Sequence, residues 1–94
     1  MGKAEYKVKD GKLIKVQLVK KGNRIEKIKI TGDFFLHPEE FIEELEEALA
    51  GHLLNESDLT KLIRSLVEKK GATLLGTSPE DFAKCIMMAA EKDD

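Results

Sequence analysis

The sequence predicts an α+β fold, in which a three-stranded antiparallel β-meander is followed by three helices packed on one face of the sheet. Up to Thr31 apolar and polar residues alternate, as they do along half-buried strands, whereas after Phe35 apolar residues recur every three to four positions, as in amphipathic helices. Strand-like and helix-like segments do not alternate, and 94 residues are enough for one modest core. We therefore expect residues 1–94 to form a single domain.

The alternating part of the chain divides into three predicted strands, at residues 5–9, 12–20 and 25–31. The dipeptide Asp10-Gly11, which favours tight hairpin turns, separates the first two strands, and residues 21–24 separate the last two. Such short turns join antiparallel neighbours. Ile25 is out of phase with Ile28 and Ile30, so either Ile25 is exposed beside the turn or a β-bulge shifts the register.

Three helices are predicted, at residues 38–50, 56–70 and 79–90. Pro38 suits the first turn of the first helix, and Asn55 and Ser78 suit the N-caps of the other two. Gly51 and Gly71 follow the first and second helices and are expected to end them.

Two stretches fall outside these elements. Residues 72–77 are expected to form a short apolar connection, and the last four residues, all charged, are expected to fray. Cys85, the only cysteine, is expected to be a small buried side chain of the third helix, and an intrachain disulfide is excluded.

Composition excludes some classes of protein. No apolar run is long enough for a membrane helix, and the N-terminal residues lack the apolar stretch of a signal peptide. A cytoplasmic protein without membrane contact is therefore expected. Charged residues make up 36% of the chain and divide unevenly, with a net charge of +7 on residues 1–31 and −9 on residues 32–94.

The positive charge is expected on the sheet face that the helices leave open, which would carry Lys7, Lys9, Lys15, Lys27 and Lys29. This face is either simply solvated or a docking surface. As a free-standing binding module, the chain would use it for nucleic acid or for an acidic protein. Nucleic acid is disfavoured, because no aromatic platform accompanies the lysines and the acidic helices would repel the polymer.

No catalytic, cofactor-binding or metal-binding residue is predicted. His37 and His52 are fifteen residues apart and lack the cysteine or carboxylate spacing that favours zinc, so they are expected to be exposed or capping histidines. Six glutamates between Glu39 and Glu47 fit the solvated side of an amphipathic helix better than a catalytic pair.

The stretch Gly32-Asp33-Phe34-Phe35 contains two adjacent aromatic rings at the end of a predicted strand. In an extended chain successive side chains point to opposite faces, so two neighbouring rings cannot easily both enter one core. One ring therefore requires a second surface, which is either a helix of the same domain or another protein.

Three motifs stand out in order along the chain: Gly11-Lys12-Leu13-Ile14-x-Val16, Ile30-Thr31-Gly32-Asp33-Phe34-Phe35, and Gly76-Thr77-Ser78-Pro79-Glu80-Asp81-Phe82. Together they resemble the C-terminal accessory domain of lipoate-protein ligases, and the resemblance spans nearly the whole chain. The Gly-Asp-Phe-Phe stretch is its most specific element, whereas the Ser-Pro-Glu-Asp helix start occurs widely. In that family the domain is a small α+β unit, in agreement with the predicted elements.

The resemblance implies a function. Lipoate-protein ligases activate lipoate with ATP to lipoyl-adenylate and pass the lipoyl group to a lysine of an acceptor domain, in 2-oxoacid dehydrogenases or the glycine cleavage H protein. In bipartite members the accessory domain is a separate chain, required for adenylation, and the large catalytic subunit binds lipoate, ATP and magnesium. The implied role is a stand-alone accessory subunit that forms a heterodimer with the large subunit and binds no cofactor alone.

Five residues are the candidates for contact with that partner: Lys12, Gly32, Asp33, Phe34 and Phe35. Gly32 would allow the backbone to leave the strand tightly, Asp33 could cap or hydrogen-bond a partner backbone, and either phenylalanine could be an aromatic anchor. Lys12 either reaches toward a phosphate or an acidic partner surface or is an ordinary hairpin lysine.

Overall fold

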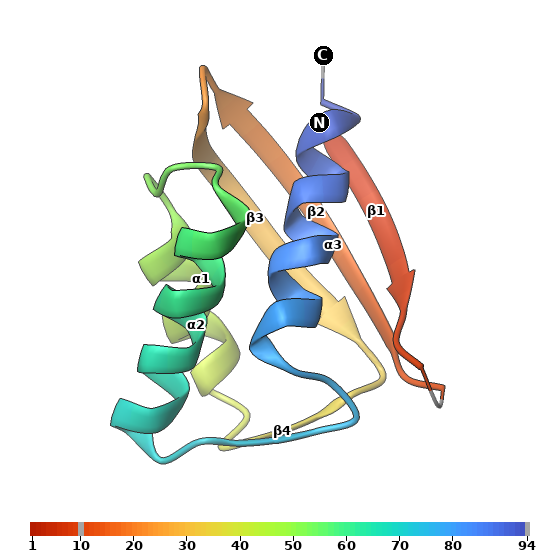
Figure 1. The fold of residues 1–94 in the computed structure, drawn as a ribbon, viewed down its shortest axis with the longest axis vertical. Helices are drawn as coiled ribbons and strands as arrows, with labels where there is room; N and C mark the ends of the chain where they lie inside the picture. Colours follow the sequence, from red (N-terminus) through yellow and green to blue (C-terminus); the bar gives the residue numbers. More distant parts are fainter. Residues whose placement is uncertain (10, 94) are drawn as a thin grey trace.

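The fold is a sheet with all its helices on one side, and the helices lie in front of the sheet in Figure 1. The computed structural model describes residues 1–9 and 11–93, so Asp10 of the predicted Asp10-Gly11 turn lies outside the described residues. The elements follow in the order β1 (Gly2–Lys7), β2 (Leu13–Lys21), β3 (Arg24–Gly32), β4 (Phe35–His37), α1 (Phe41–Leu49), α2 (Glu56–Lys70), β5 (Thr73–Leu75) and α3 (Pro79–Glu91). The predicted α+β class is confirmed, with two short strands added.

The main sheet is the predicted meander, with the order β1-β2-β3 and antiparallel pairing throughout. Its first strand begins at Gly2, three residues before the predicted start. The prediction missed this part because the inward positions are the small residues Gly2 and Ala4, which carry little hydrophobic signal. A Cβ atom on Gly2 would collide with the carbonyl oxygen of Ala89, so α3 approaches the strand too closely for a larger side chain.

A β-bulge resolves the phase of Ile25. The pairing of β2 with β3 shifts between Val19 and Lys20, and beyond the shift Ile25 is buried, with 1% of its surface exposed. Its N–H donates to the carbonyl of His52 at 2.9 Å, which ties the start of β3 to the segment after α1. The bulge, rather than exposure beside the turn, is therefore the correct alternative.

The second and third helices begin as predicted. The Asn55 side chain accepts a hydrogen bond from the N–H of Asp58, and Ser78 and Asp81 form a reciprocal capping box at the start of α3. The first helix begins at Phe41 rather than at Pro38, so this predicted start is wrong. The Phe41 N–H bonds to the Pro38 carbonyl three residues back, so the segment after β4 is a tighter turn that precedes the helix.

The core lies between the sheet and the helices. α3 packs on β1 and β2, α1 packs on β3, and α2 packs against the other two helices (Figure 1). Phe82 and Cys85 of α3 are fully buried against the inward side chains of the sheet, as expected for both. Along residues 1–9 and 11–93, no helix is long and apolar enough to cross a membrane.

The end of the chain is bound to the sheet. Asp93 is 6% exposed, and its carboxylate accepts the backbone N–H of Lys20 at 2.7 Å and pairs with the Met1 ammonium at 2.9 Å. The expectation that the last four residues fray is therefore wrong for Asp93, because the Met1 ammonium and the Lys20 N–H bind a charge that periodicity alone marks as exposed. Asp94 lies outside the described residues.

Asp93→Asn is expected to lower the melting temperature at pH 7. The difference in melting temperature between the variant and the wild type should become smaller as the pH falls below 4. The Lys20 N–H and then the Met1 ammonium hold the pKa of Asp93 below its usual value of 3.8. A lowered native pKa stabilises the fold above the unfolded value, and this stabilisation is lost as pH falls through the native value. Thermal melts of both proteins between pH 7 and pH 2.5 test this, with Glu91→Gln as the control. Equal differences at every pH would contradict the prediction.

Candidate functional site

The three motifs singled out in the sequence meet at one end of the molecule, the lower end in Figure 1. Leu13 of the first motif bonds to Asp33 of the second, the Lys12 side chain lies against Gly76 of the third, and Phe34 packs on Phe82. Segments far apart in the sequence are therefore in direct contact, and they build one surface together.

Asp33 closes the end of the β2–β3 pair. Its N–H donates to the Leu13 carbonyl at 3.1 Å, and its Oδ1 accepts the Leu13 N–H at 2.5 Å. Of the two roles considered for Asp33, a cap and a bond to a partner backbone, the structure shows a cap on the chain's own backbone. The hydrogen bond from the Leu13 N–H to the Asp33 carboxylate is strong because its acceptor is charged. This bond fixes the point at which the chain leaves the sheet.

Gly32 has a backbone that other residues rarely adopt, with φ at +152°. A Cβ atom there would collide with the Leu13 carbonyl oxygen and would come within 2.9 Å of the Phe34 ring. The glycine therefore provides the tight exit that the sequence predicted, and it lets Phe34 fold back against the end of the sheet.

The two phenylalanines divide between core and surface. The half-buried Phe34 ring meets Phe82 edge to face, with ring centroids 5.1 Å apart and an interplanar angle of 90°. Phe35 is 52% exposed, and its ring stacks on His37 at 6.4 Å. The sequence left open whether both rings are buried, and the structure places only Phe34 in the core.

Phe35 belongs to a small second sheet that the sequence did not predict. β4 and β5 pair antiparallel, with Phe35 opposite Leu75, Leu36 opposite Leu74 and His37 opposite Thr73. Residues 72–77 were expected to be a connection, and this expectation is wrong for β5. Three residues are too few to show an alternating pattern, and the strand with which they pair comes much earlier in the chain.

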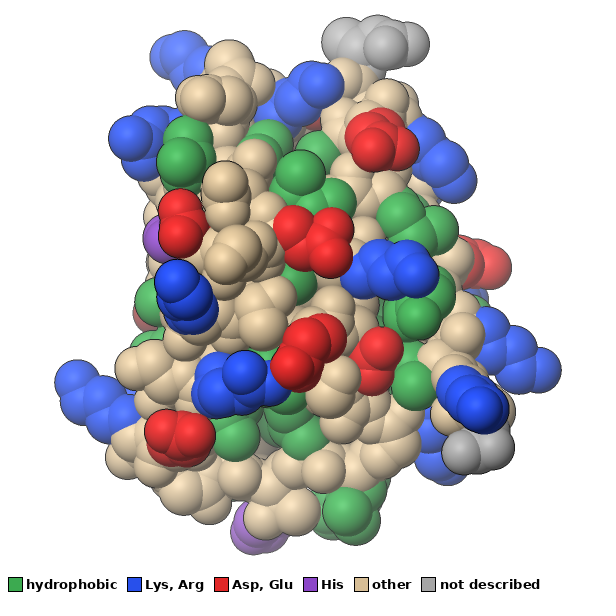
Figure 2. All heavy atoms as spheres, in the orientation of Figure 1, with side chains coloured by type: hydrophobic (Ala, Val, Ile, Leu, Met, Phe, Trp, Pro, Cys, Tyr) green, Lys and Arg blue, Asp and Glu red, His purple; other side chains and the backbone are tan. Residues whose placement is uncertain are grey.

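The outward face of this ribbon forms an apolar patch, which we call the Phe35–Leu75 patch after its two directly opposed side chains. Leu75 is 56% exposed, so two large apolar side chains lie side by side in solvent. Hydrophobic and histidine side chains project at the lower end of the molecule in Figure 2. Contiguous exposed apolar side chains of this kind are typical of docking surfaces.

An open pocket of about 330 Å³ adjoins the Phe35–Leu75 patch. Its walls come from the end of β3, from residues 34–36 and from Glu39 and Ile42. The exposed Phe35 side chain therefore lines a pocket that a side chain from another protein can enter.

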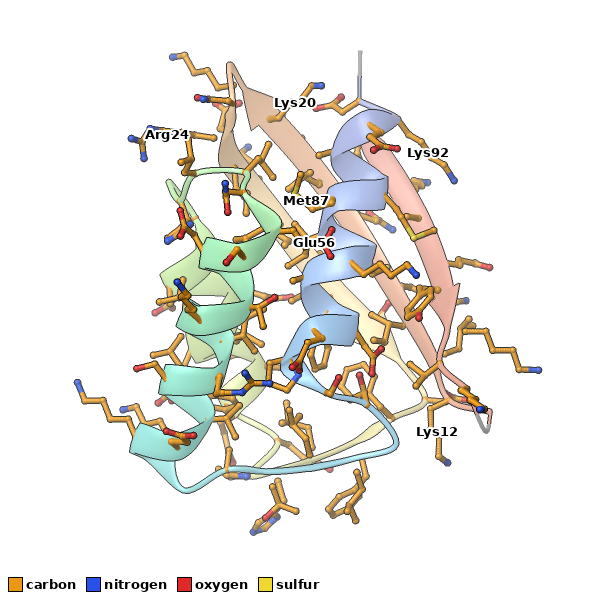
Figure 3. The ribbon with its side chains drawn as sticks, in the orientation of Figure 1. Lys12, Lys20, Arg24, Glu56, Met87 and Lys92 are labelled. Carbon is orange, nitrogen blue, oxygen red and sulfur yellow. The ribbon has the colours of Figure 1, made fainter. Side chains whose placement is uncertain are left out.

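Lys12 lies at the same end, where its exposed side chain extends beyond the hairpin (Figure 3). A Cβ atom on Gly76 would collide with the Cγ of Lys12, so the aliphatic stem lies against the glycine, which has φ at +84°. This contact holds the lysine against the loop that precedes α3. This contact could not be predicted from the sequence, because Gly76 resembles any other turn glycine.

Cys85 and His52, two of the remaining candidate groups, have structural partners. The Cys85 thiol lies 3.7 Å from the Ala4 carbonyl and 3.6 Å from that of Ile14, and burial raises its pKa to about 11. His52 is half-buried, with Nδ1 3.0 Å from the Leu53 carbonyl oxygen, whereas His37 is exposed. Within the part of the chain that the structure describes, no three His, Cys, Asp or Glu side chains are grouped so that they could hold a metal ion.

Comparisons with known proteins agree with one another. A family model described as the bacterial lipoate protein ligase C-terminus matches residues 4–86. Lipoate-protein ligase A subunit 2 of Thermoplasma acidophilum is 40% identical over 81 residues, which are 86% of this chain and 82% of the relative. A chain from the structural analysis of an archaeal lipoylation system, a bi-partite lipoate protein ligase and its E2 lipoyl domain from the same organism, has a TM-score of 0.78. It is 37% identical, and the match covers 89% of this chain and 91% of that one.

Proposed function

Because the chain belongs to the family described as the bacterial lipoate protein ligase C-terminus, we propose that it is the accessory subunit of a bipartite lipoate-protein ligase. The relatives support this role, since one is the second subunit of such a ligase and the other comes from a bi-partite enzyme. A free-standing nucleic-acid-binding module is not favoured, because the family match covers residues 4–86.

The observation that carries the proposal is the exposed Phe35–Leu75 patch at the end where the three motifs meet. A large catalytic subunit that docks there removes both side chains from water, and aromatic anchors beside a pocket commonly dominate the energy of an interface. Gly32, Asp33 and Phe34 support this contact from within the domain, since each is engaged in holding the end of the sheet.

Lys12 is the charged member of this interface. Its stem lies against Gly76, and its exposed side chain can contact a carboxylate or phosphate group that the partner brings to the edge of the patch. A lysine already held along its stem loses less side-chain entropy when it forms such a contact.

In this proposal the large subunit binds lipoate, ATP and magnesium, and the accessory subunit makes adenylation possible. A lipoate carboxylate oxygen attacks the α-phosphorus of ATP, pyrophosphate leaves, and lipoyl-adenylate remains. A lysine amine of the acceptor domain then attacks the acyl carbon, and AMP leaves. The accessory subunit contributes no reacting group. It acts by closing the site, excluding water and holding a loop of the partner in position, which can supply several kcal/mol toward a transition state.

The acceptors in this proposal are lipoyl domains of 2-oxoacid dehydrogenases or the glycine cleavage H protein, and the location is the cytoplasm. The proposal is tested by mass spectrometry of an acceptor domain incubated with lipoate, ATP and magnesium. We expect the lipoyl mass increase only when this chain and the matching large subunit are both present. Full lipoylation by either chain alone would contradict it.

A further inference from the structure

The outer face of the main sheet carries a set of lysines that the proposed docking of the large subunit does not use. With the strand registers known, five exposed lysines point to this side, and we call them the lysine face: Lys3, Lys7, Lys15, Lys27 and Lys29. Lys3 joins the set because β1 begins earlier than predicted, whereas the exposed Lys9 lies beyond the end of β1.

The lysine face is open and strongly positive. All three helices lie on the other side of the sheet (Figure 1). The acidic Glu5 also lies on this face, opposite Lys15 with an N···O distance of 3.8 Å, and the exposed Glu26 adjoins Lys27 at its edge. Lysines gathered on one face of a sheet repel one another and lower the stability of the fold. A partner that carries negative charge would relieve this repulsion.

The lysine face also has a shallow hollow of about 200 Å³, formed where β2 and β3 pair next to the bulge. Gln17, Val19, Lys27 and Lys29 are among its lining residues. An apolar floor with cationic groups at its rim fits a surface that combines carboxylates with a small apolar side chain.

We propose that the lysine face receives the lipoyl-acceptor domain through carboxylates on that domain's surface, an inference that rests on the proposed function. The two partners of an accessory subunit differ in how long they stay bound. In the proposed heterodimer the catalytic subunit stays bound between turnovers, which suits the apolar Phe35–Leu75 patch. An acceptor must arrive and leave in every turnover, which suits charge complementarity that accelerates encounter without tight binding.

The test uses the reconstituted two-subunit enzyme and the apo lipoyl domain of the same organism's 2-oxoacid dehydrogenase. Lys27→Glu with Lys29→Glu reverses two lysines of the face. Lys61→Glu with Lys69→Glu is the matched control, since it makes the same change in charge on exposed positions of α2. Thermal melts of both variants check that each is folded.

We expect the Lys27→Glu, Lys29→Glu variant to raise the KM for the acceptor domain about tenfold and to lose most of the salt dependence of lipoylation. Lipoate-dependent pyrophosphate release in the absence of acceptor should be unchanged, and the control variant should resemble the wild type. This pattern separates acceptor recruitment from adenylation.

Three other results would overturn the inference. An unchanged KM for the acceptor with normal pyrophosphate release would overturn this inference and leave the proposed function standing. Salt-sensitive DNA binding by the lysine face, without an effect on the KM for the acceptor, would do the same. Loss of pyrophosphate release in the variant would assign the face to the catalytic subunit instead. If wild-type protein gave no adenylation with the matching large subunit, the proposed function would fail first, and this inference with it.

Discussion

Replacing Phe35 and Leu75 together by alanine is expected to weaken binding to the catalytic subunit by more than about 2 kcal/mol, which is roughly 30-fold in Kd. The two side chains are opposed on β4 and β5 and are about half exposed, so the isolated domain gains little from them. The melting temperature of the isolated variant should therefore stay close to that of the wild type. Isothermal titration with the large subunit and a thermal melt measure the two quantities.

Phe34→Ala is the matched comparison, because it removes an aromatic ring from the neighbouring position. The Phe34 ring packs on Phe82, so this variant should lower the melting temperature of the isolated domain. Unchanged affinity of the Phe35→Ala, Leu75→Ala variant would show that the patch is not the docking surface. A large loss of its stability would show that both side chains belong to the core.

Gly32→Ala is expected to destabilise the fold by about 3 kcal/mol. The added Cβ requires a strained backbone at φ +152° and collides with the Leu13 carbonyl oxygen, and each effect costs about 1–3 kcal/mol. For a domain of this size the melting temperature should fall by roughly 12 °C or more.

Gly22→Ala is the control for this prediction, since Gly22 also has a positive φ, at +62°, but among the described residues no atom beyond its chain neighbours lies within 4 Å of the added Cβ. It should cost about 1–2 kcal/mol, from backbone conformation alone. Equal losses for the two variants, measured by urea unfolding, would show that the close approach of Leu13 and Phe34 is not what requires glycine at position 32.

The long elements of this fold could be predicted because each carries its own pattern. β2 alternates between buried and exposed residues from Ile14 to Leu18, and α2 has both an asparagine N-cap and a glycine beyond its last turn. β5 could not be predicted, since its three residues form a strand only because β4 lies beside them. The buried carboxylate of Asp93 was missed for the same reason, as its two donors come from Met1 and Lys20.

The candidate site also contains residues that the sequence could predict and residues that it could not. The Gly32-to-Phe35 stretch was recognisable because two adjacent rings conflict with strand geometry. The structure resolves the conflict by packing the half-buried Phe34 against the core and exposing Phe35. Leu75, the other half of the patch, has no signal of its own in the sequence. Its exposure follows from the register of β5 against β4, which is a property of the folded chain.

The central claim is that this chain enables a separate catalytic subunit to form lipoyl-adenylate. The most direct measurement is lipoate-dependent release of pyrophosphate from ATP by the large subunit, with and without this chain and without any acceptor domain. The proposed function predicts little or no release by the large subunit alone and a rate that rises with this chain until the two are equimolar. An equal rate of pyrophosphate release in its absence would contradict the claim.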